Sequence, residues 1–481
     1  MYSTTRALNL GLTVFVALAT SVFAAEQEST KSPPNIVVVL CDDLGYGDLS
    51  CYGHMKIKTP HLDRFASEGL RLTDCYASAP VCSPSRCGLL TGRTPIRLAV
   101  DDWIPPGSEM HMAREELTIT TLLQKKGYAT AIVGKWHCNG KFNSTEQPQP
   151  SDHGFQYWFC TQNNADPSHL DPVNFVRNGK EVGKQTGYSS TIIVDESIRW
   201  LRKHSAPVAD GNVDKKAASQ PFCLFVWFHT PHEPVTTASE FTKRHADIGN
   251  PKQADYFGNV EQMDHEFGRL MSELDKLGNR DNTLVLFTSD NGPETLNRYR
   301  TADRSYGTAA PLRGMKLHLY EGGIRVPGLA RWPGHIQAGS VSAEPVSNVD
   351  FLPTCCELAG IPLPTDRALD GTSLVPLFRY SDPAKQSPLT RKQPLYWQYQ
   401  RAIGPNKIAV RDQDWKLLAD DSMTKFELYN LRQDRQEAQN LAADPQHAAN
   451  LASLKSKMAA IYQDVLADRP DLKPPVVKPR K

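Results

Sequence analysis

The sequence predicts an α/β fold in which a largely parallel sheet is covered by helices. Two observations carry this prediction. Short apolar runs rich in β-branched residues alternate along the chain with amphipathic stretches, and those stretches have the length and period of helices. The chain has 481 residues, of which 40% are hydrophobic, so it can bury a large core. It contains no internal repeats.

The expected elements follow one another in strand–helix order. Strands are expected over residues 36–40, 131–133, 222–228 and 283–288. Helices are expected over residues 118–126, stopped by Gly127, over 191–204, and over 255–277, closed by Gly278. Near the C-terminus, residues 395–468 begin with short strand-like pieces and end with a helix over 448–466. This last region therefore predicts a second, smaller unit.

The N-terminal segment predicts export. Arg6 precedes an apolar run over residues 8–23, and Val22-Phe23-Ala24 resembles a signal-peptidase site. So short a run with a small-residue exit is typical of a signal peptide, residues 1–24, and an uncleaved anchor is the alternative. No other apolar run is long enough to span a bilayer. We therefore expect no membrane insertion and a periplasmic, extracellular or lysosome-like location.

The rest of the chain divides by composition. Residues 33–380 are expected to form the large α/β domain, and residues 394–468 the C-terminal subdomain. The polar stretch 381–393 links the two. The tail, residues 469–481, is rich in Pro and Lys and is expected to be disordered.

Charge and cysteine content exclude some functions. The formal net charge is +1, from 54 Lys and Arg against 53 Asp and Glu, which gives no overall field for nucleic acid or an anionic membrane. Ten cysteines in a chain of this length do not make a disulfide scaffold, and no zinc-binding pattern is present. The disulfide connectivity cannot be read from the sequence.

Polar side chains follow four of the expected strands. They are Asp42-Asp43, Gly134-Lys135-Trp136-His137, His229-Thr230-Pro231-His232 and Asp290-Asn291-Gly292. In open parallel sheets, ligands bind at the carboxyl ends of the strands, so we expect these side chains at one edge.

Four of these residues form a set of hard oxygen ligands. Asp42, Asp43, Asp290 and Asn291 supply carboxylate and amide oxygens, which suit Ca²⁺ or Mg²⁺ better than zinc. Taken separately, each pair is also typical of a helix cap or a turn. Taken together, they predict a metal site.

The segment over residues 82–93, CSPSRCGLLTGR, is the most specific signal in the chain. Ser83 can act as an N-cap with Pro84 at the first helical position, so a helix is expected to begin beside Cys82. The start of a helix attracts anions, and Arg86 lies about one turn further on. The alternative is a free or disulfide-bonded cysteine beside an ordinary helix start.

These residues resemble the type I sulfatases, whose signature is C-x-P-S-R-x-x-x-L-T-G-R. The resemblance extends through the strand ends above, Lys316, residues 320–323 and residues 428–431, and covers about residues 33–465. Residues 319–334 are most similar to the arylsulfatase and N-acetylgalactosamine-6-sulfatase branch. The resemblance implies the alkaline-phosphatase-like sulfatase fold: a large mixed, mostly parallel sheet flanked by helices, plus a small C-terminal antiparallel sheet with a packed helix.

The resemblance also implies the chemistry and its cofactors. A formylglycine-generating maturation enzyme would convert Cys82 to Cα-formylglycine, whose hydrate attacks the sulfur of a sulfate ester and then expels inorganic sulfate. One Ca²⁺ would be held by Asp42, Asp43, Asp290 and Asn291, together with residue 82.

The remaining roles are implied residue by residue. Arg86 would steady the formylglycine hydrate, and Lys135 and Lys316 would bind sulfate oxygens. His137 is the expected base. His232, with Lys316, is the expected acid for the leaving oxygen, whereas His229 is expected to be structural.

The expected substrate is a sulfated carbohydrate. The polar loops over residues 101–111, 141–172 and 297–306 could contact a sugar or could simply be solvated. Alternatives are a formylglycine-dependent phosphodiesterase or phosphonate monoester hydrolase of the same superfamily, a non-catalytic carbohydrate-binding paralogue, and an enzyme that its host does not mature.

Overall fold

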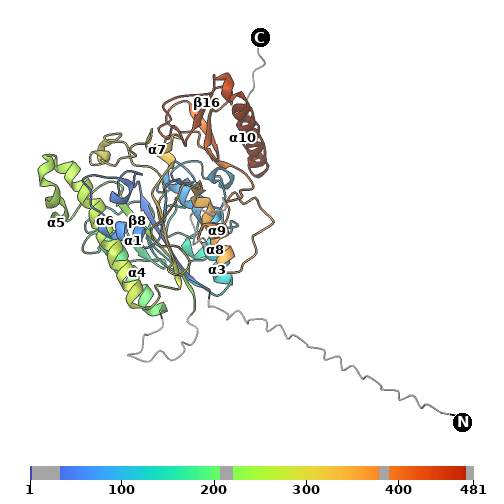
Figure 1. Cartoon of the computed structure of the whole chain (residues 1–481). Helices are drawn as coiled ribbons and strands as arrows, with labels where there is room; N and C mark the ends of the chain where they lie inside the picture. The colour runs from blue at the N-terminus through green and yellow to red at the C-terminus, as the bar shows by residue number, and fades with distance from the viewer. Residues whose placement is uncertain (3–32, 206–219, 379–388, 473–481) are drawn as a thin grey trace. The chain divides into compact units, whose positions relative to one another are not determined.

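A ten-stranded mixed sheet lies at the centre of the fold (Figure 1). The computed structural model describes residues 1–2, 33–205, 220–378 and 389–472. Five neighbouring strands run parallel: β9 (Thr283–Ser289), β1 (Asn35–Asp42), β8 (Phe222–Pro231), β4 (Ala129–Lys135) and β5 (Tyr157–Thr161). The flanking strands are β10 (Gly328–Arg331), β2 (Leu70–Leu72) and β11 (Ser340–Ser342) on one side, and β6 (Val176–Arg177) and β7 (Lys180–Glu181) on the other. The predicted large, mostly parallel sheet is confirmed.

Helices cover both faces of this sheet because its strands are apolar on both sides. Along β1, Ile36 and Val38 belong to one buried cluster and Val37 and Val39 to the other, as the period of two in a strand requires. One face packs against α2 (Cys82–Thr91), α3 (Ile119–Lys125), α8 (Phe351–Leu358) and α9 (Val375–Phe378). The other face packs against α1 (Pro60–Ser67), α4 (Ser189–His204) and α6 (Pro251–Lys276) (Figure 1).

Short elements complete the described part of the chain. They are β3 (Cys75–Tyr76), which pairs with β12 (Val346–Ser347), and the helices α5 (Ser239–Thr242) and α7 (Glu321–Ile324).

The expected helices are present, and their ends have identifiable causes. Thr118 is the N-cap of α3, where its hydroxyl accepts the Thr121 N–H at 3.1 Å. Helix α6 begins at Pro251, four residues before the predicted start, because the Asn250 side chain accepts from two backbone N–H groups of the first turn. The polar first turn of α6 hid this start from the apolar pattern.

A four-stranded antiparallel sheet with one long helix forms the C-terminal part. Its strands are β13 (Leu395–Gln398), β14 (Asn406–Asp412), β15 (Trp415–Asp420) and β16 (Phe426–Asn430), and its helix is α10 (Ala448–Asp468). Met458 and Ile461 of α10 pack with Val410 and Leu417 of the sheet. The predicted small sheet with a packed helix is confirmed.

Several expectations concern the ends of the chain. Apart from its first two residues, the predicted signal peptide lies outside the described residues, as do residues 473–481 of the predicted tail. Within the tail, Arg469 is buried and pairs with Asp101 at 2.8 Å. Among the described helices, none combines the length and the apolar character needed to cross a membrane. The boundary between the two predicted domains stays a prediction.

Candidate active site

The carboxyl ends of β1 and β9 bring four oxygen-bearing side chains together. These strands are adjacent, with Cys41 opposite Ser289, so the residues that follow each strand meet at the same edge. The Asp43 N–H donates to Asp290 Oδ1 at 3.2 Å, and Asn291 Nδ2 donates to Asp43 Oδ1 at 2.6 Å. Asp42 and these three residues are all buried. The predicted oxygen set is therefore one cluster in space.

Two lysines from distant parts of the chain neutralise this cluster. Lys135, at the end of β4, places its Nζ 2.6 Å from Asp42 Oδ2. Lys316, in the loop before α7, places its Nζ 2.7 Å from Asp43 Oδ2. Burial alone would raise the pKa of Asp42, but Lys135 and other nearby cations hold that pKa well below its usual range. Burial, together with the charge of Asp42, raises the pKa of Asp290 to about 6.

Cys82 is the first residue of α2 and is buried. The N-cap is Val81, so the expected Ser83 N-cap is wrong: the Ser83 hydroxyl instead accepts the Ile104 N–H at 3.0 Å. Burial raises the pKa of Cys82 to about 11, although Lys135 and Lys316 act against it. At neutral pH the unmodified side chain is therefore a thiol, which is a poor nucleophile.

Arg86 ties α2 to the ends of two strands. Its Nε donates to Asp290 Oδ2 at 2.9 Å and an Nη donates to the Lys135 carbonyl at 3.0 Å. The guanidinium also lies over the Trp227 ring, 5.1 Å from its centroid. Since Arg86 is buried, these contacts fix the start of α2 relative to the oxygen cluster.

Hydrogen bonds to backbone carbonyls fix the tautomers of the two predicted catalytic histidines. His137 Nε2 donates to the Ile104 carbonyl at 3.0 Å, and Nδ1 has no partner among the described residues. His232 Nδ1 donates to the Glu233 carbonyl at 2.7 Å, so its Nε2 carries no proton. This Nε2 lies 3.6 Å from Asp43 Oδ2. Burial lowers the pKa of both rings well below the usual value, so both are neutral.

His229 differs from these two rings. Its Nε2 is hydrogen-bonded to Thr161 Oγ1 at 2.7 Å, and it does not line the cavity described below. This position fits the structural role expected for His229, which stays a prediction.

The oxygen cluster has the chemistry of a cation site. Asp42 Oδ1 and Asn291 Oδ1 are buried and have no hydrogen-bond partner among the described residues. Ligand atoms of Asp42, Asp43 and His232 lie within 4.8 Å of one another, and so do those of Asp43, Glu233 and Glu294. Unpartnered oxygens in a buried acidic cluster fit a hard divalent cation.

Sequence reasoning missed Glu233 and Glu294. Glu233 lies just beyond the His229-Thr230-Pro231-His232 segment, and Glu294 lies just beyond the Asp290-Asn291-Gly292 segment.

A cavity of about 520 Å³ opens onto this site. Cys82, His137, His232 and Lys316 line it, whereas Arg86 and Lys135 are buried and are not among its lining residues. The further lining comes from loops that sequence reasoning named only as ranges or not at all: Val81, Asp102, Trp103, Asn163, Asn164, Glu233, Arg298, Tyr299, Thr301, Leu317, Tyr399 and Arg401. The sulfur of Cys82 thus faces a space large enough for a small ligand.

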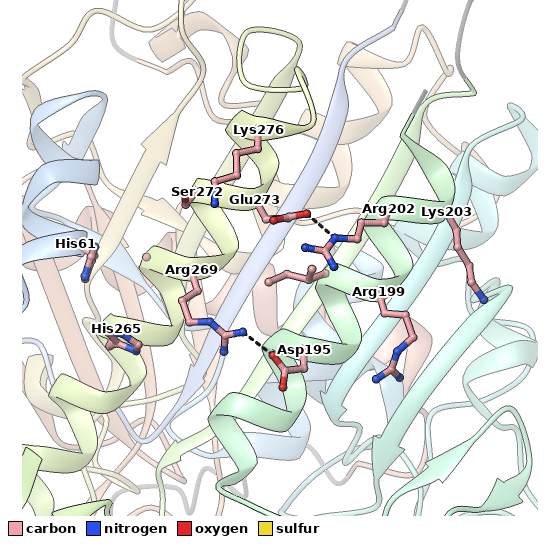
Figure 2. A pocket seen from close by; sticks show the side chains of 12 residues that line it. His61, Asp195, Arg199, Arg202, Lys203, His265, Arg269, Ser272, Glu273 and Lys276 are labelled. Atoms are coloured by element: carbon pink, nitrogen blue, oxygen red, sulfur yellow. Dashed lines mark hydrogen bonds and ion pairs between the residues drawn. The ribbon is translucent and has the colours of Figure 1, made fainter. Parts of the chain in front are cut away.

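A second, open groove lies between α4 and α6 (Figure 2). Ion pairs cross it, Arg202 with Glu273 and Arg269 with Asp195, both at 2.6 Å. None of the sequence-predicted site residues is among the described side chains that line it. The groove therefore has no part in the site around Cys82.

Comparisons with known proteins agree with this geometry. The sulfatase family model matches residues 34–361, and a model of the C-terminal part of N-sulphoglucosamine sulphohydrolase matches residues 315–464. Arylsulfatase A of Homo sapiens is 36% identical over 355 residues, which cover 72% of this chain and 68% of that protein. N-acetylgalactosamine-6-sulfatase of Rattus norvegicus is 34% identical over 398 residues, covering 77% and 70%.

Solved structures agree as well. The crystal structure of Ps i-CgsB in complex with k-i-k-neocarrahexaose superposes with a TM-score of 0.75 at 28% identity, covering 91% of this chain and 93% of that one. This likeness supports the expected alkaline-phosphatase-like sulfatase fold. The chain belongs to the sulfatase family, whose members are sulfuric ester hydrolases.

Proposed function

We propose that this protein is an exported, calcium-dependent sulfatase that removes sulfate from a sulfated carbohydrate with a formylglycine made from Cys82. One observation carries the proposal. Cys82 opens into a cavity between Lys316, His137 and His232, directly beside a buried acidic cluster with unpartnered oxygens. An anionic ester, a nucleophile, proton carriers and a cation can meet there.

The high pKa of the Cys82 thiol favours a nucleophile made from Cys82, an aldehyde hydrate, over the unmodified side chain. A pKa of about 11 leaves little thiolate at neutral pH, so an unmodified Cys82 would attack slowly. A hydrated formylglycine offers two hydroxyls: one forms the bond to sulfur, and loss of the proton from the other expels sulfate and restores the aldehyde. A formylglycine-generating maturation enzyme is thus a required partner.

The acidic cluster is proposed to hold Ca²⁺ through Asp42, Asp43, Asp290 and Asn291. When bound, the ion would offset the negative charge of the sulfate oxygens near residue 82. Lys135 and Lys316 would then be free to donate hydrogen bonds from Nζ to the sulfate oxygens. Arg86, held by Asp290, would orient the hydrate at the start of α2.

Proton movements follow from the two histidine tautomers. His137 carries a lone pair on Nδ1, so it can take the hydrate proton during the elimination of sulfate. His232 is proposed to act with Lys316 on the leaving oxygen: its Nε2 would have to take up a proton before it could give one, whereas Lys316 can donate a proton from Nζ. Burial would lower the pKa of Lys316, but Asp43 and neighbouring carboxylates raise it well above the usual value, so Lys316 stays charged.

The carbohydrate substrate and the location rest on further arguments. The carrahexaose complex of a relative supports a sugar as the leaving group. The apolar N-terminal run supports export to the periplasm, the extracellular space or a lysosome-like compartment.

The test is release of inorganic sulfate, measured by ion chromatography. The protein is co-expressed with a formylglycine-generating enzyme and incubated with sulfated mono- and oligosaccharides and an aryl sulfate, with Cys82→Ala as the control. We expect release that is absent from the control. If mass spectrometry finds the aldehyde at residue 82 and no sulfate ester is cleaved, turnover of phosphodiesters would replace this proposal.

A further inference from the structure

Three cationic side chains line the described cavity, and each of them pairs with a carboxylate. Lys316 contacts Asp43 at 2.7 Å and Glu294 at 3.6 Å. Arg298 makes two parallel hydrogen bonds to Glu294, both at 2.7 Å. The third cation, Arg401, has a different environment.

Arg401 lines the cavity and is largely exposed to solvent. Its side chain is 74% exposed, and its one ion pair among the described residues joins an Nη to Asp102 Oδ2 at 3.0 Å. Asp102 is buried and also accepts the Tyr399 hydroxyl at 2.6 Å. One edge of the guanidinium is therefore held by a fixed carboxylate, and the remaining N–H groups are free to bind a ligand.

Exposed aromatic and apolar side chains line the same cavity as Arg401 or lie on its turn. Trp103 and Tyr299 line the same cavity and are 42% and 37% exposed, although side chains of this size are usually buried. Ile403, on the same turn as Arg401, is also exposed, and its N–H donates to the Leu317 carbonyl at 2.8 Å. Exposed aromatic rings and a largely exposed guanidinium in one cavity suit a sugar ring that carries an anion.

We propose that Arg401 and Trp103 form a second subsite, which binds an anionic group on the sugar unit next to the sulfate ester. This inference rests on the proposed function. The anion is a carboxylate or a second sulfate; both accept two parallel hydrogen bonds from a guanidinium, which an ammonium cannot donate in this geometry. Trp103 would stack on the ring that carries this anion.

The test compares four substrates: an aryl sulfate, a neutral disaccharide monosulfate, and the same disaccharide with a carboxylate or a second sulfate on the neighbouring unit. We expect Arg401→Gln to lower kcat/KM about tenfold for the anionic disaccharides, through KM. The aryl sulfate and the neutral disaccharide should be unaffected. A larger effect for one of the two anions identifies the natural group. The proposal is overturned if Arg401→Gln lowers kcat/KM equally for the neutral and the anionic disaccharides, or if it changes kcat/KM for neither anionic disaccharide.

Arg432→Gln is the matched control, because Arg432 is also exposed and pairs with one carboxylate, Asp414, at 3.0 Å, but does not line the cavity. Arg432→Gln should leave kcat/KM unchanged for all four substrates. Trp103→Ala should lower kcat/KM for all three disaccharides and leave that for the aryl sulfate unchanged, and an equal loss for the aryl sulfate would contradict the stacking role.

A binding measurement separates this proposal from the proposed function. Calorimetry with the Cys82→Ala protein records the affinity for the anionic disaccharides without turnover. If the wild-type protein releases no sulfate, the proposed function fails. Weaker binding by the Cys82→Ala, Arg401→Gln protein would then still uphold the subsite, and equal binding would overturn it.

Discussion

Replacing Lys416 with methionine should destabilise the protein by about 3–5 kcal/mol, because it removes the cation that two buried carboxylates share. Lys416 lies on β15, and its Nζ contacts Glu321 Oε1 at 2.9 Å and Glu437 Oε1 at 2.8 Å. All three side chains are fully buried. Methionine fills similar volume, so the loss measures charge rather than packing.

The pKa values of the carboxylates make this loss depend on pH. Burial raises the pKa of Glu437 to about 7 even with Lys416 beside it. Burial opposes ionisation of Glu321 too, but Lys416 and nearby cations lower its pKa to about 2. Without Lys416 both values rise, so the native state of the variant binds more protons than the unfolded chain. Its deficit against wild type should therefore shrink as pH falls from 8 to 5, by up to about 1.4 kcal/mol per pH unit for each group that titrates.

The assay is thermal and urea unfolding of both proteins between pH 5 and pH 8. A loss of this size lowers Tm by about 3–5 °C in a domain this large. The second change Glu437→Gln should recover part of the loss at pH 8. Lys457→Met, which breaks an exposed pair with Asp412, should change stability by less than about 1 kcal/mol. A Lys416→Met protein within 1 kcal/mol of wild type, or a deficit that grows in acid, would refute the reasoning.

Three further outcomes are expected. Cys82→Ser should fold normally, release no inorganic sulfate and release at most one equivalent of the alcohol, since the serine sulfate that forms has no elimination route; steady release of sulfate would contradict it. Chelation of calcium should lower Tm and stop turnover, and 100 Kd of added Ca²⁺ should restore about 2.7 kcal/mol, whereas a Tm unchanged by chelator would remove the cation from the site. Burial lowers the pKa of His153 to about 4 from 6.5, so acid protonates the unfolded chain first and stability falls between pH 7 and pH 5 by about 2 kcal/mol from this ring. In His153→Gln, the free energy of unfolding measured in urea should fall less between pH 7 and pH 5. An unchanged dependence on pH would contradict this role of His153.

The catalytic edge of the sheet could be predicted because its residues follow strands directly. Asp42 and Asp290 come at the ends of apolar runs, and parallel strands deliver such residues to one edge whatever the sequence distance between them. The start of α2 was harder to place. Ser83 and Val81 compete for the N-cap position, and the choice depends on Ile104, a tertiary partner that local sequence does not identify.

The outer wall of the cavity could not be predicted in the same way. Tyr399 and Arg401 belong to a turn between β13 and β14, on the other sheet, and no periodic pattern marks a turn as part of a site. Glu233 and Glu294 were missed for a different reason. Their carboxylates meet Asp43 only because three loops converge, and such convergence depends on packing rather than on spacing.

The burial of α2 has a consequence for when Cys82 could be converted. Every residue from Cys82 to Thr91 is buried, and Arg86 is fastened to both Asp290 and the Lys135 carbonyl. If Cys82 is converted as proposed, the maturation enzyme would need access to this segment, so the oxidation would come before α2 is buried. Once folded, an unconverted molecule would remain inactive for as long as it stays folded. The yield of active protein should therefore depend on the rate of Cys82 oxidation relative to the rate of folding. Conditions that delay folding should increase the active fraction.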